Sequence, residues 1–326
     1  MATVYTIGEA LIDFIPARKG VELKSVESFT KAAGGAPANV ACAVAKLGGH
    51  AAFIGKLGED AFGDFLVEKL ADSGVNVSCV LRTSEANTAL AFVSLKEDGN
   101  RDFSFYRNPS ADMLLNEDEI SDSWFARGDL LHFCSVDLIE APVKYAHRKA
   151  IGLAREAGAV ISFDPNVRLP LWPDGESCRR AIHEFLPLSH IVKISDEELF
   201  FITGHADEKE AIASLFVGDV QHVIYTRGAA GATWFSRSGL EVSVPGNRVK
   251  VADTTGAGDS FIGALLYQAQ STPQILQQLA QVDHEQVQEL LRFANAAAAL
   301  TASRPGAIDA LPSLQDVEAF LRGEAD

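Results

Sequence analysis

Residues 253–261 read Asp-Thr-Thr-Gly-Ala-Gly-Asp-Ser-Phe and lead directly into an apolar run. Gly256 and Gly258 allow the backbone to turn tightly and to expose its N–H groups. We expect a helix over residues 259–270, and the positive end of its dipole points at the same place. Exposed N–H groups and a helix N-terminus together favour an anion, so this stretch predicts a phosphate-binding hole.

Asp259 lies at the start of the predicted helix and has two alternative roles. As an N-cap it satisfies backbone donors and has no chemistry of its own. Beside a phosphate site, the same carboxylate is a candidate general base. Other phosphate and catalytic motifs are missing: Phe261 stands where a dinucleotide fingerprint needs its third glycine, and no P-loop, G-x-S-x-G elbow or zinc-protease motif occurs.

Short apolar runs alternate with helical patterns along the whole chain. This alternation predicts an α/β fold with a doubly wound, mostly parallel sheet flanked by helices, and we expect residues 1–326 to form one domain. Two segments, residues 14–33 and 87–111, do not follow this alternation, and we call them the two excursions. They carry strand-like patches, and the turn at Asp98-Gly99-Asn100 predicts that they form a small separate antiparallel sheet. The expected strands are residues 4–8, 51–55, 90–95, 130–134, 159–164, 191–194 and 222–226; the expected helices are 36–47, 61–72, 143–157, 197–203, 259–270 and 286–302.

Several predicted strands run into residues that carry chemistry. Glu9 and Asp13 follow the first strand, residues 164–168 (Asp-Pro-Asn-Val-Arg) end another, and residues 226–228 (Thr-Arg-Gly) end a third. Ligands of doubly wound folds bind at the carboxyl ends of the strands, so these residues mark the expected position of a site.

The charge and cysteine content limit the classes of function. The 28 basic and 44 acidic residues give a net charge of −16, which disfavours a general nucleic-acid or anionic-membrane binder. The four cysteines have no C-x-x-C spacing, which is typical of buried thiols in a reducing compartment. No signal-peptide pattern and no apolar stretch of about 18 residues is visible. We therefore expect a cytoplasmic protein without nucleic-acid or membrane partners.

Two further glycine-rich stretches precede predicted helices. Residues 34–41 read Gly-Gly-Ala-Pro-Ala-Asn-Val-Ala, in which the glycines allow close approach of a ligand and Asn39 offers a donor and acceptors to a sugar hydroxyl. The alternative is plain helix initiation, for which Pro37 is well suited. Residues 55–63 form a strand-to-helix turn that we expect to be mainly structural.

These three stretches, in this order and spacing, resemble the two signatures of the ribokinase-like (phosphofructokinase-B) family of carbohydrate kinases. Within the family, residues 8–13, 105–112, 163–173 and 193–198 look most like those of fructokinases. One departure is Ser195, which stands where the family commonly has the Asn of an Asn-x-x-Glu motif, while Glu198 is kept.

The resemblance implies a role for each matching residue. For Arg107 and Arg168, the alternative to a role in the site is an ion pair at the surface. For the alanine-rich segment around Asn295, the alternative is close packing between helices. The implied catalytic residues are Asp259 with the loop Gly256, Ala257 and Gly258; the sugar contacts are Asp13, Gly34, Gly35, Asn39, Arg107 and Arg168; the nucleotide contacts are Lys193, Ser195, Thr226, Gly228, Gly231 and Asn295; and the metal neighbours are Glu198 and Asp253.

The resemblance also implies the activity and its cofactors. Family members transfer the γ-phosphoryl group of ATP, as Mg-ATP and often with K⁺, to a sugar hydroxyl, which here implies conversion of D-fructose to fructose 6-phosphate. The two excursions would form a β-sheet lid over the sugar, and such lids often pair into homodimers. Aminoimidazole riboside, 2-keto-3-deoxygluconate and ribose are alternative acceptors. A catalytically silent sugar-binding regulator and a nucleotide-dependent dehydrogenase are the alternatives from other classes.

Overall fold

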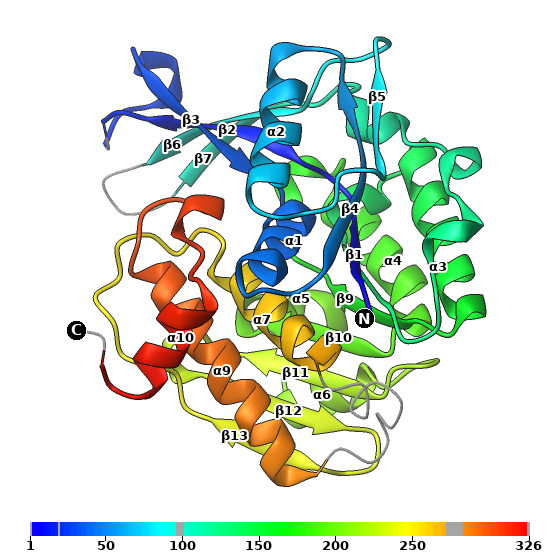
Figure 1. Ribbon diagram of the computed structural model, residues 1–326, viewed down its shortest axis with the longest axis vertical. Helices are drawn as coiled ribbons and strands as arrows, with labels where there is room; N and C mark the ends of the chain where they lie inside the picture. The colour runs from blue at the N-terminus through cyan, green and yellow to red at the C-terminus, as the bar shows by residue number, and fades with distance from the viewer. Residues whose placement is uncertain (1, 19, 96–100, 272–282, 325–326) are drawn as a thin grey trace.

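The computed structural model describes residues 2–18, 20–95, 101–271 and 283–324. The predicted turn at residues 98–100 lies outside this part of the chain. The described elements form one large sheet covered by helices and one small sheet beside it (Figure 1).

The large sheet is doubly wound, as predicted. From β1 the chain runs outward to β4 and β5 in one direction and then from β8 to β11 in the other, so the direction changes between β1 and β8. These strands pair in parallel, and only the edge pairs β11–β12 and β12–β13 are antiparallel. Its nine strands, in spatial order, are β13 (Glu241–Val244), β12 (Ala232–Ser236), β11 (His222–Thr226), β10 (Ile191–Ser195), β9 (Val160–Asp164), β8 (Leu130–Cys134), β1 (Val4–Ile7), β4 (Ala51–Gly58) and β5 (Val80–Thr83).

Helices cover both faces of the large sheet and form two apolar cores (Figure 1). All six predicted helices are present. Three further helices, α4, α6 and α10, were not predicted. One layer contains α1 (Ala36–Lys46), α7 (Ala257–Ser271), α9 (His284–Ala302) and α10 (Leu314–Leu321); the other contains α3 (Pro142–Ala157), α4 (Gly175–Phe185), α5 (Asp196–Thr203) and α6 (Glu208–Ser214); α2 (Ala61–Asp72) lies near the small sheet.

The small sheet comes from the two excursions, with the strand order β3 (Phe29–Gly34), β2 (Leu11–Pro16), β6 (Leu90–Leu95) and β7 (Arg101–Tyr106). The sheet is mixed and not wholly antiparallel as predicted, because β2 and β6 pair in parallel. The Phe14 and Phe92 rings stack with centroids 4.6 Å apart, and Phe14 also contacts Phe62 of α2 edge-on. Aromatic packing therefore fixes one face of this sheet against α2.

Within the described ranges, no helix is both long enough and apolar enough to cross a membrane. The four cysteines are free and buried, as expected from their spacing.

Candidate active site

The loop before α7 is held in shape by Asp253. Its Oδ1 accepts hydrogen bonds from the Thr255 N–H and hydroxyl at 2.9 and 2.7 Å, and its Oδ2 accepts one from the Gly306 N–H at 3.4 Å. Gly256 follows with φ +76°, a conformation that favours glycine. The helix begins at Ala257, whose N–H donates to the Thr254 carbonyl at 3.2 Å. The loop thus delivers the first turn of α7 to the carboxyl ends of the strands.

Lys193 brings a buried positive charge to the same helix N-terminus. Its Nζ lies 2.8 Å from Asp164 Oδ2, and a Cβ placed on Gly258 would lie 3.3 Å from that Nζ. Burial opposes the charge on Lys193, but the carboxylates of Asp164, Glu198 and Asp259 together outweigh this effect and raise the pKa of the ammonium. The Lys193 ammonium and the N-terminus of α7 both attract negative charge, so this geometry fits an anion-binding site.

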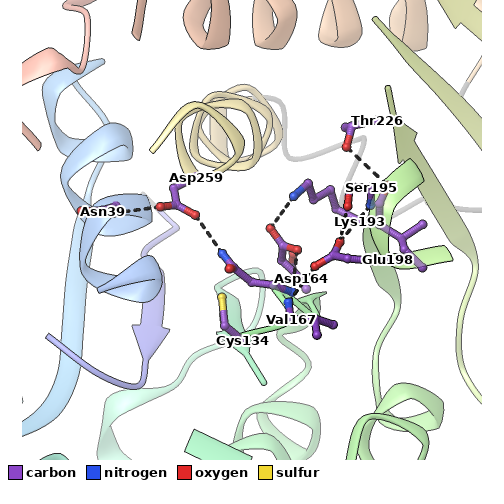
Figure 2. A network of polar contacts seen from close by, with 12 residues as sticks. Asn39, Cys134, Asp164, Val167, Lys193, Ser195, Glu198, Thr226 and Asp259 are labelled. Atoms are coloured by element: carbon purple, nitrogen blue, oxygen red, sulfur yellow. Dashed lines mark hydrogen bonds and ion pairs between the residues drawn. The ribbon is translucent and has the colours of Figure 1, made fainter. Parts of the chain in front are cut away.

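Asp259 is buried in the first turn of α7 and faces two amide side chains. Its Oδ2 accepts a hydrogen bond from Asn39 Nδ2 at 2.8 Å, and its Oδ1 accepts one from Asn166 Nδ2 at 3.2 Å. Figure 2 shows Asn39 reaching Asp259 from the neighbouring helix. Burial raises the pKa of Asp259, although both amides and the charges of Arg168 and Lys193 act in the opposite direction. The Asp259 carboxylate is therefore a stronger base than a carboxylate in water.

Asp164 and Asn166 were not among the predicted site residues. Burial raises the pKa of Asp164 to about 6, even though the charge of Lys193 acts in the opposite direction. The sequence signal was present, because both residues lie in the stretch 164–168 that ends a predicted strand. What the sequence could not give is the direction of the Asn166 side chain.

Glu198 organises the carboxyl end of β10 (Figure 2). Its Oε2 accepts hydrogen bonds from the Ser195 N–H and hydroxyl at 3.0 and 2.8 Å, and its Oε1 accepts one from the Val167 N–H at 2.7 Å. Burial acts against ionisation, but the Lys193 charge and these donors hold the pKa of Glu198 below its usual value. Ser195 thus caps α5 together with Glu198, and Thr226 reaches the Ile194 carbonyl at 3.4 Å from the next strand.

The glycine pair before α1 is tightly enclosed. A Cβ on Gly34 would lie 2.2 Å from Asp13 Oδ2, and Gly35 has φ +105° with the Glu9 carbonyl 2.4 Å from its Cβ position. Glu9 Oε1 accepts the Ala36 N–H at 3.0 Å and so caps α1. Only glycine fits at these positions, and they bring Asp13 of the small sheet beside the first turn of α1.

Arg107, which the sequence predicts as a sugar contact with an ion pair as the alternative, lies in a buried cluster of ion pairs. The residue follows β7 and is buried, and its guanidinium contacts the carboxylates of Asp112 and Asp137. The Nε–Oδ2 distance to Asp112 is 2.7 Å. Arg107 therefore joins the end of the small sheet to the segment after β8. Arg168, by contrast, is exposed, and its charge lowers the pKa of Asp259.

The predicted nucleotide residues beyond Thr226 gather where β11 and β13 end and the antiparallel β12 begins. Gly228 and Gly231 have φ +48° and +96°, and a Cβ on Gly231 would lie 2.1 Å from the Val244 carbonyl. Asn295 Nδ2 donates to the carbonyls of Val244 and Pro245 at 3.3 and 3.2 Å, which fixes α9 against this edge.

No group of three or more His, Cys, Asp and Glu side chains in the described part of the chain is arranged to hold a metal ion. The three donors on Glu198 already occupy much of its carboxylate. This arrangement fits a Mg²⁺ ion that is held by phosphates and water with Glu198 as an outer partner, which is how Mg²⁺ commonly binds at phosphate sites.

The comparisons with known proteins agree with this geometry. The model of the pfkB family carbohydrate kinases matches residues 1–314. The chain is 44% identical to probable fructokinase-5 of Arabidopsis thaliana, over 99% of this chain and 98% of that protein. Two solved structures cover 98–99% of this chain and 99% of their own: fructokinase from Xylella fastidiosa with bound ATP, with 38% identity and TM-score 0.89, and fructokinase from Vibrio cholerae O395 with fructose, ADP and calcium ion bound, with 34% identity and TM-score 0.87. The chain therefore belongs to the pfkB family of carbohydrate kinases.

Proposed function

We propose that this sugar kinase transfers the γ-phosphoryl group of Mg-ATP to a hydroxyl of D-fructose and produces fructose 6-phosphate. The observation that carries the proposal is the buried Asp259 carboxylate, held by two amides at the N-terminus of α7 beside Lys193. The fructokinase relatives support fructose as the acceptor.

Phosphoryl transfer passes through a loose transition state, so catalysis rests on positioning and charge neutralisation. Asp259 accepts the proton as the sugar oxygen bonds to the γ-phosphorus and the bond to the β-phosphate oxygen breaks. Lys193 and the first turn of α7 stabilise the negative charge on the transferred group and on the leaving ADP. The proton passes to Asp259, the phosphoryl group passes to the sugar, and ADP keeps the bonding electrons.

The remaining assignments follow the two sides of the anion site. On the sugar side, Asp13 accepts hydrogen bonds from two hydroxyls, and Arg168 lies at the exposed rim. Gly34, Gly35 and Asn39 line the same side. On the nucleotide side we place Lys193, Ser195, Thr226, Gly228, Gly231 and Asn295.

Among the alternative acceptors, the placement of Arg107 favours a neutral sugar. A keto acid such as 2-keto-3-deoxygluconate would need cationic side chains to bind its carboxylate. Arg107 and Arg168 are the two arginines among the predicted sugar contacts. The structure engages Arg107 with two buried carboxylates and leaves Arg168 as the accessible one of the two.

Cations complete the proposal. Mg²⁺ supplies charge neutralisation to the phosphates when bound, with Glu198 as an outer partner through water. We place K⁺ beside the loop that Asp253 ties to Gly306. Replacing K⁺ by Na⁺ in the assay below is expected to lower kcat, and an equal kcat in both salts would remove K⁺ from the account.

The small sheet is assigned as the lid of the site. Its closure over the sugar excludes water and so suppresses hydrolysis of ATP. Its edge strands β3 and β7 are available for pairing with a second copy, so we propose a homodimer, which sedimentation velocity would detect.

We treat residues 1–326 as one domain and place the enzyme in the cytoplasm, in keeping with four free buried thiols.

The test is turnover with Mg-ATP and K⁺ on fructose, aminoimidazole riboside, 2-keto-3-deoxygluconate, ribose and glucose in one coupled assay. We expect fructose to have the highest kcat/KM, about 10⁴ M⁻¹s⁻¹ or more. A higher value on another acceptor would replace fructose but keep the kinase mechanism. Sugar binding without turnover on any acceptor would indicate a silent regulator, and NAD(H) binding would indicate a dehydrogenase.

A further inference from the structure

Asn166 adopts an uncommon backbone conformation next to the proposed base. Among the described residues it is the one non-glycine residue with a positive φ, +44°. Such a conformation is unfavourable for a residue with a Cβ, although Asn tolerates it better than most. Unfavourable conformations of this kind concentrate at functional sites, where the surrounding structure maintains them.

The contacts of Asn166 point its side chain at Asp259. Its backbone N–H donates to Asp164 Oδ1 at 3.2 Å, and its Nδ2 donates to Asp259 Oδ1 at 3.2 Å. This contact fixes the orientation of the amide, because the opposite orientation would set the carbonyl oxygen against a carboxylate. Asn166 Oδ1 therefore points away from Asp259.

That carbonyl oxygen is buried and has no hydrogen-bond partner among the described residues. Asn39 donates to the other oxygen of Asp259 through its Nδ2. The Oδ1 of Asn39 is likewise buried and has no hydrogen-bond partner among the described residues. Buried acceptors without partners are uncommon in native proteins, and a bound ligand is one way to satisfy them. The donors that a sugar brings are hydroxyl groups, and one of them must lie next to Asp259 to be phosphorylated.

We propose that Asn166 is a positioning residue of the kinase reaction: it holds the Asp259 carboxylate toward the acceptor hydroxyl and accepts a hydrogen bond from the bound sugar through its own Oδ1. The proposal rests on the assignment of Asp259 as the base. It differs from a purely structural role because an N–H donor on a carboxylate stabilises the charged form.

This donor has a measurable consequence for Asp259. The hydrogen bond from Asn166 lowers the pKa of Asp259, which burial raises. The elements around Asp259 bring four ionisable groups that act on it. They are Lys193 of β10, Asp164 of β9, Cys134 of β8, and Arg168, which follows β9. These groups are retained when Asn166 is changed, so a shift in the titration of Asp259 reports the lost donor.

Asn166→Gly separates the amide from the backbone conformation, because glycine adopts positive φ freely. We expect the variant to fold and to lower kcat by about 10- to 100-fold, the range for a misplaced reacting group. The KM for the sugar rises as well, because the acceptor oxygen is lost. The acid limb of kcat/KM moves to higher pH, and it moves further in Asn166→Asp, in which a second carboxylate faces the first. Unchanged kcat and an unmoved acid limb in Asn166→Gly would overturn the proposal.

A second readout does not depend on the identity of the sugar. A carboxyl group whose folded pKa is raised contributes stability at pH values below about 4, and this contribution is lost as the pH rises through the folded pKa. Because Asn166→Gly raises the pKa of Asp259 further, its melting temperature relative to wild type should fall as the pH rises above about 4. Asn76→Gly, an exposed Asn on the far side of β4, is the control and should show a constant difference. A constant difference in Asn166→Gly too would contradict the proposal.

The two readouts also separate this proposal from the assignment of the acceptor. The kinetic ratio is measured on whichever sugar the wild type phosphorylates best, so a different acceptor leaves it intact. If no sugar is phosphorylated, the kinase function fails, and the melting curves still decide whether Asn166 acts on Asp259.

Discussion

Replacing Asp259 by asparagine is expected to lower kcat by about 10²- to 10⁴-fold, the usual contribution of general acid–base catalysis. Asparagine keeps the size of the side chain, but it cannot accept the proton of the attacking hydroxyl. The KM for ATP should change little, because Asp259 lies on the sugar side. Steady-state kinetics on fructose, with calorimetric titration of the sugar, would separate lost chemistry from lost binding.

Asp174→Asn is the matched control, because Asp174 caps α4 through the Ser177 N–H at 2.7 Å and takes no part in the site. It should keep wild-type kcat. The pH profile gives an independent check: burial raises the pKa of Asp259, so the acid limb of kcat/KM should lie above the value of about 4 for an unperturbed Asp. Wild-type turnover in Asp259→Asn would remove Asp259 from the catalytic role.

Replacing Lys193 by methionine should weaken both catalysis and the fold. The lost ammonium no longer stabilises the transferred phosphoryl group, and loss of one such preorganised group costs about 10²- to 10³-fold in kcat. The change also leaves Asp164 buried without its 2.8 Å partner, which costs about 3–5 kcal/mol of unfolding free energy. Urea titration and kinetics with varied ATP measure the two effects.

The stability loss should depend on pH. The folded pKa of Asp164 is about 6, above its unfolded value of about 4, so its contribution to stability is lost as the pH rises through about 6. Without Lys193 that pKa rises further, so the stability deficit of Lys193→Met should be larger at pH 7.5 than at pH 5. Equal deficits at the two pH values would contradict the buried pairing.

Two further variants separate the roles of Lys193. Adding Asp164→Asn to Lys193→Met should restore much of the stability but not the turnover, because the buried charge is gone and the ammonium is still missing. Lys56→Met is the control: this buried lysine pairs with Glu119 at 2.6 Å, away from the site. It should lower stability and leave the KM for ATP unchanged.

Six strands of the large sheet were predicted because they are almost wholly buried and read as continuous apolar runs: β1, β4, β8, β9, β10 and β11. The strands β5, β12 and β13 were not predicted; β5 has no fully buried residue, and β13 alternates exposed and buried residues. The strand pairing inside the small sheet was predicted less well. A turn signal indicates an antiparallel hairpin, but β2 and β6 come from different excursions, and their parallel register depends on packing far from any turn. The helices α4, α6 and α10 were also missed.

The site shows the same division between local and long-range information. The glycines of residues 34–41 and 253–261 have local reasons to be glycine, so their loops were recognised from sequence. Arg107 was predicted as a sugar contact, but its carboxylate partners were not, because Asp112 and Asp137 lie 5 and 30 residues further along the chain. The direction of the Asn166 side chain depends on a positive φ that one sequence does not reveal.

The central claim is that Asp259 and the first turn of α7 direct the phosphoryl group of ATP onto a sugar hydroxyl of fructose. The most direct test is phosphorus NMR of the product after incubation of the protein with Mg-ATP, K⁺ and D-fructose. The account predicts one equivalent of ADP and one phosphomonoester on C6 of fructose, with little free phosphate. ADP accompanied by free phosphate alone, or an ester at another carbon, would contradict it.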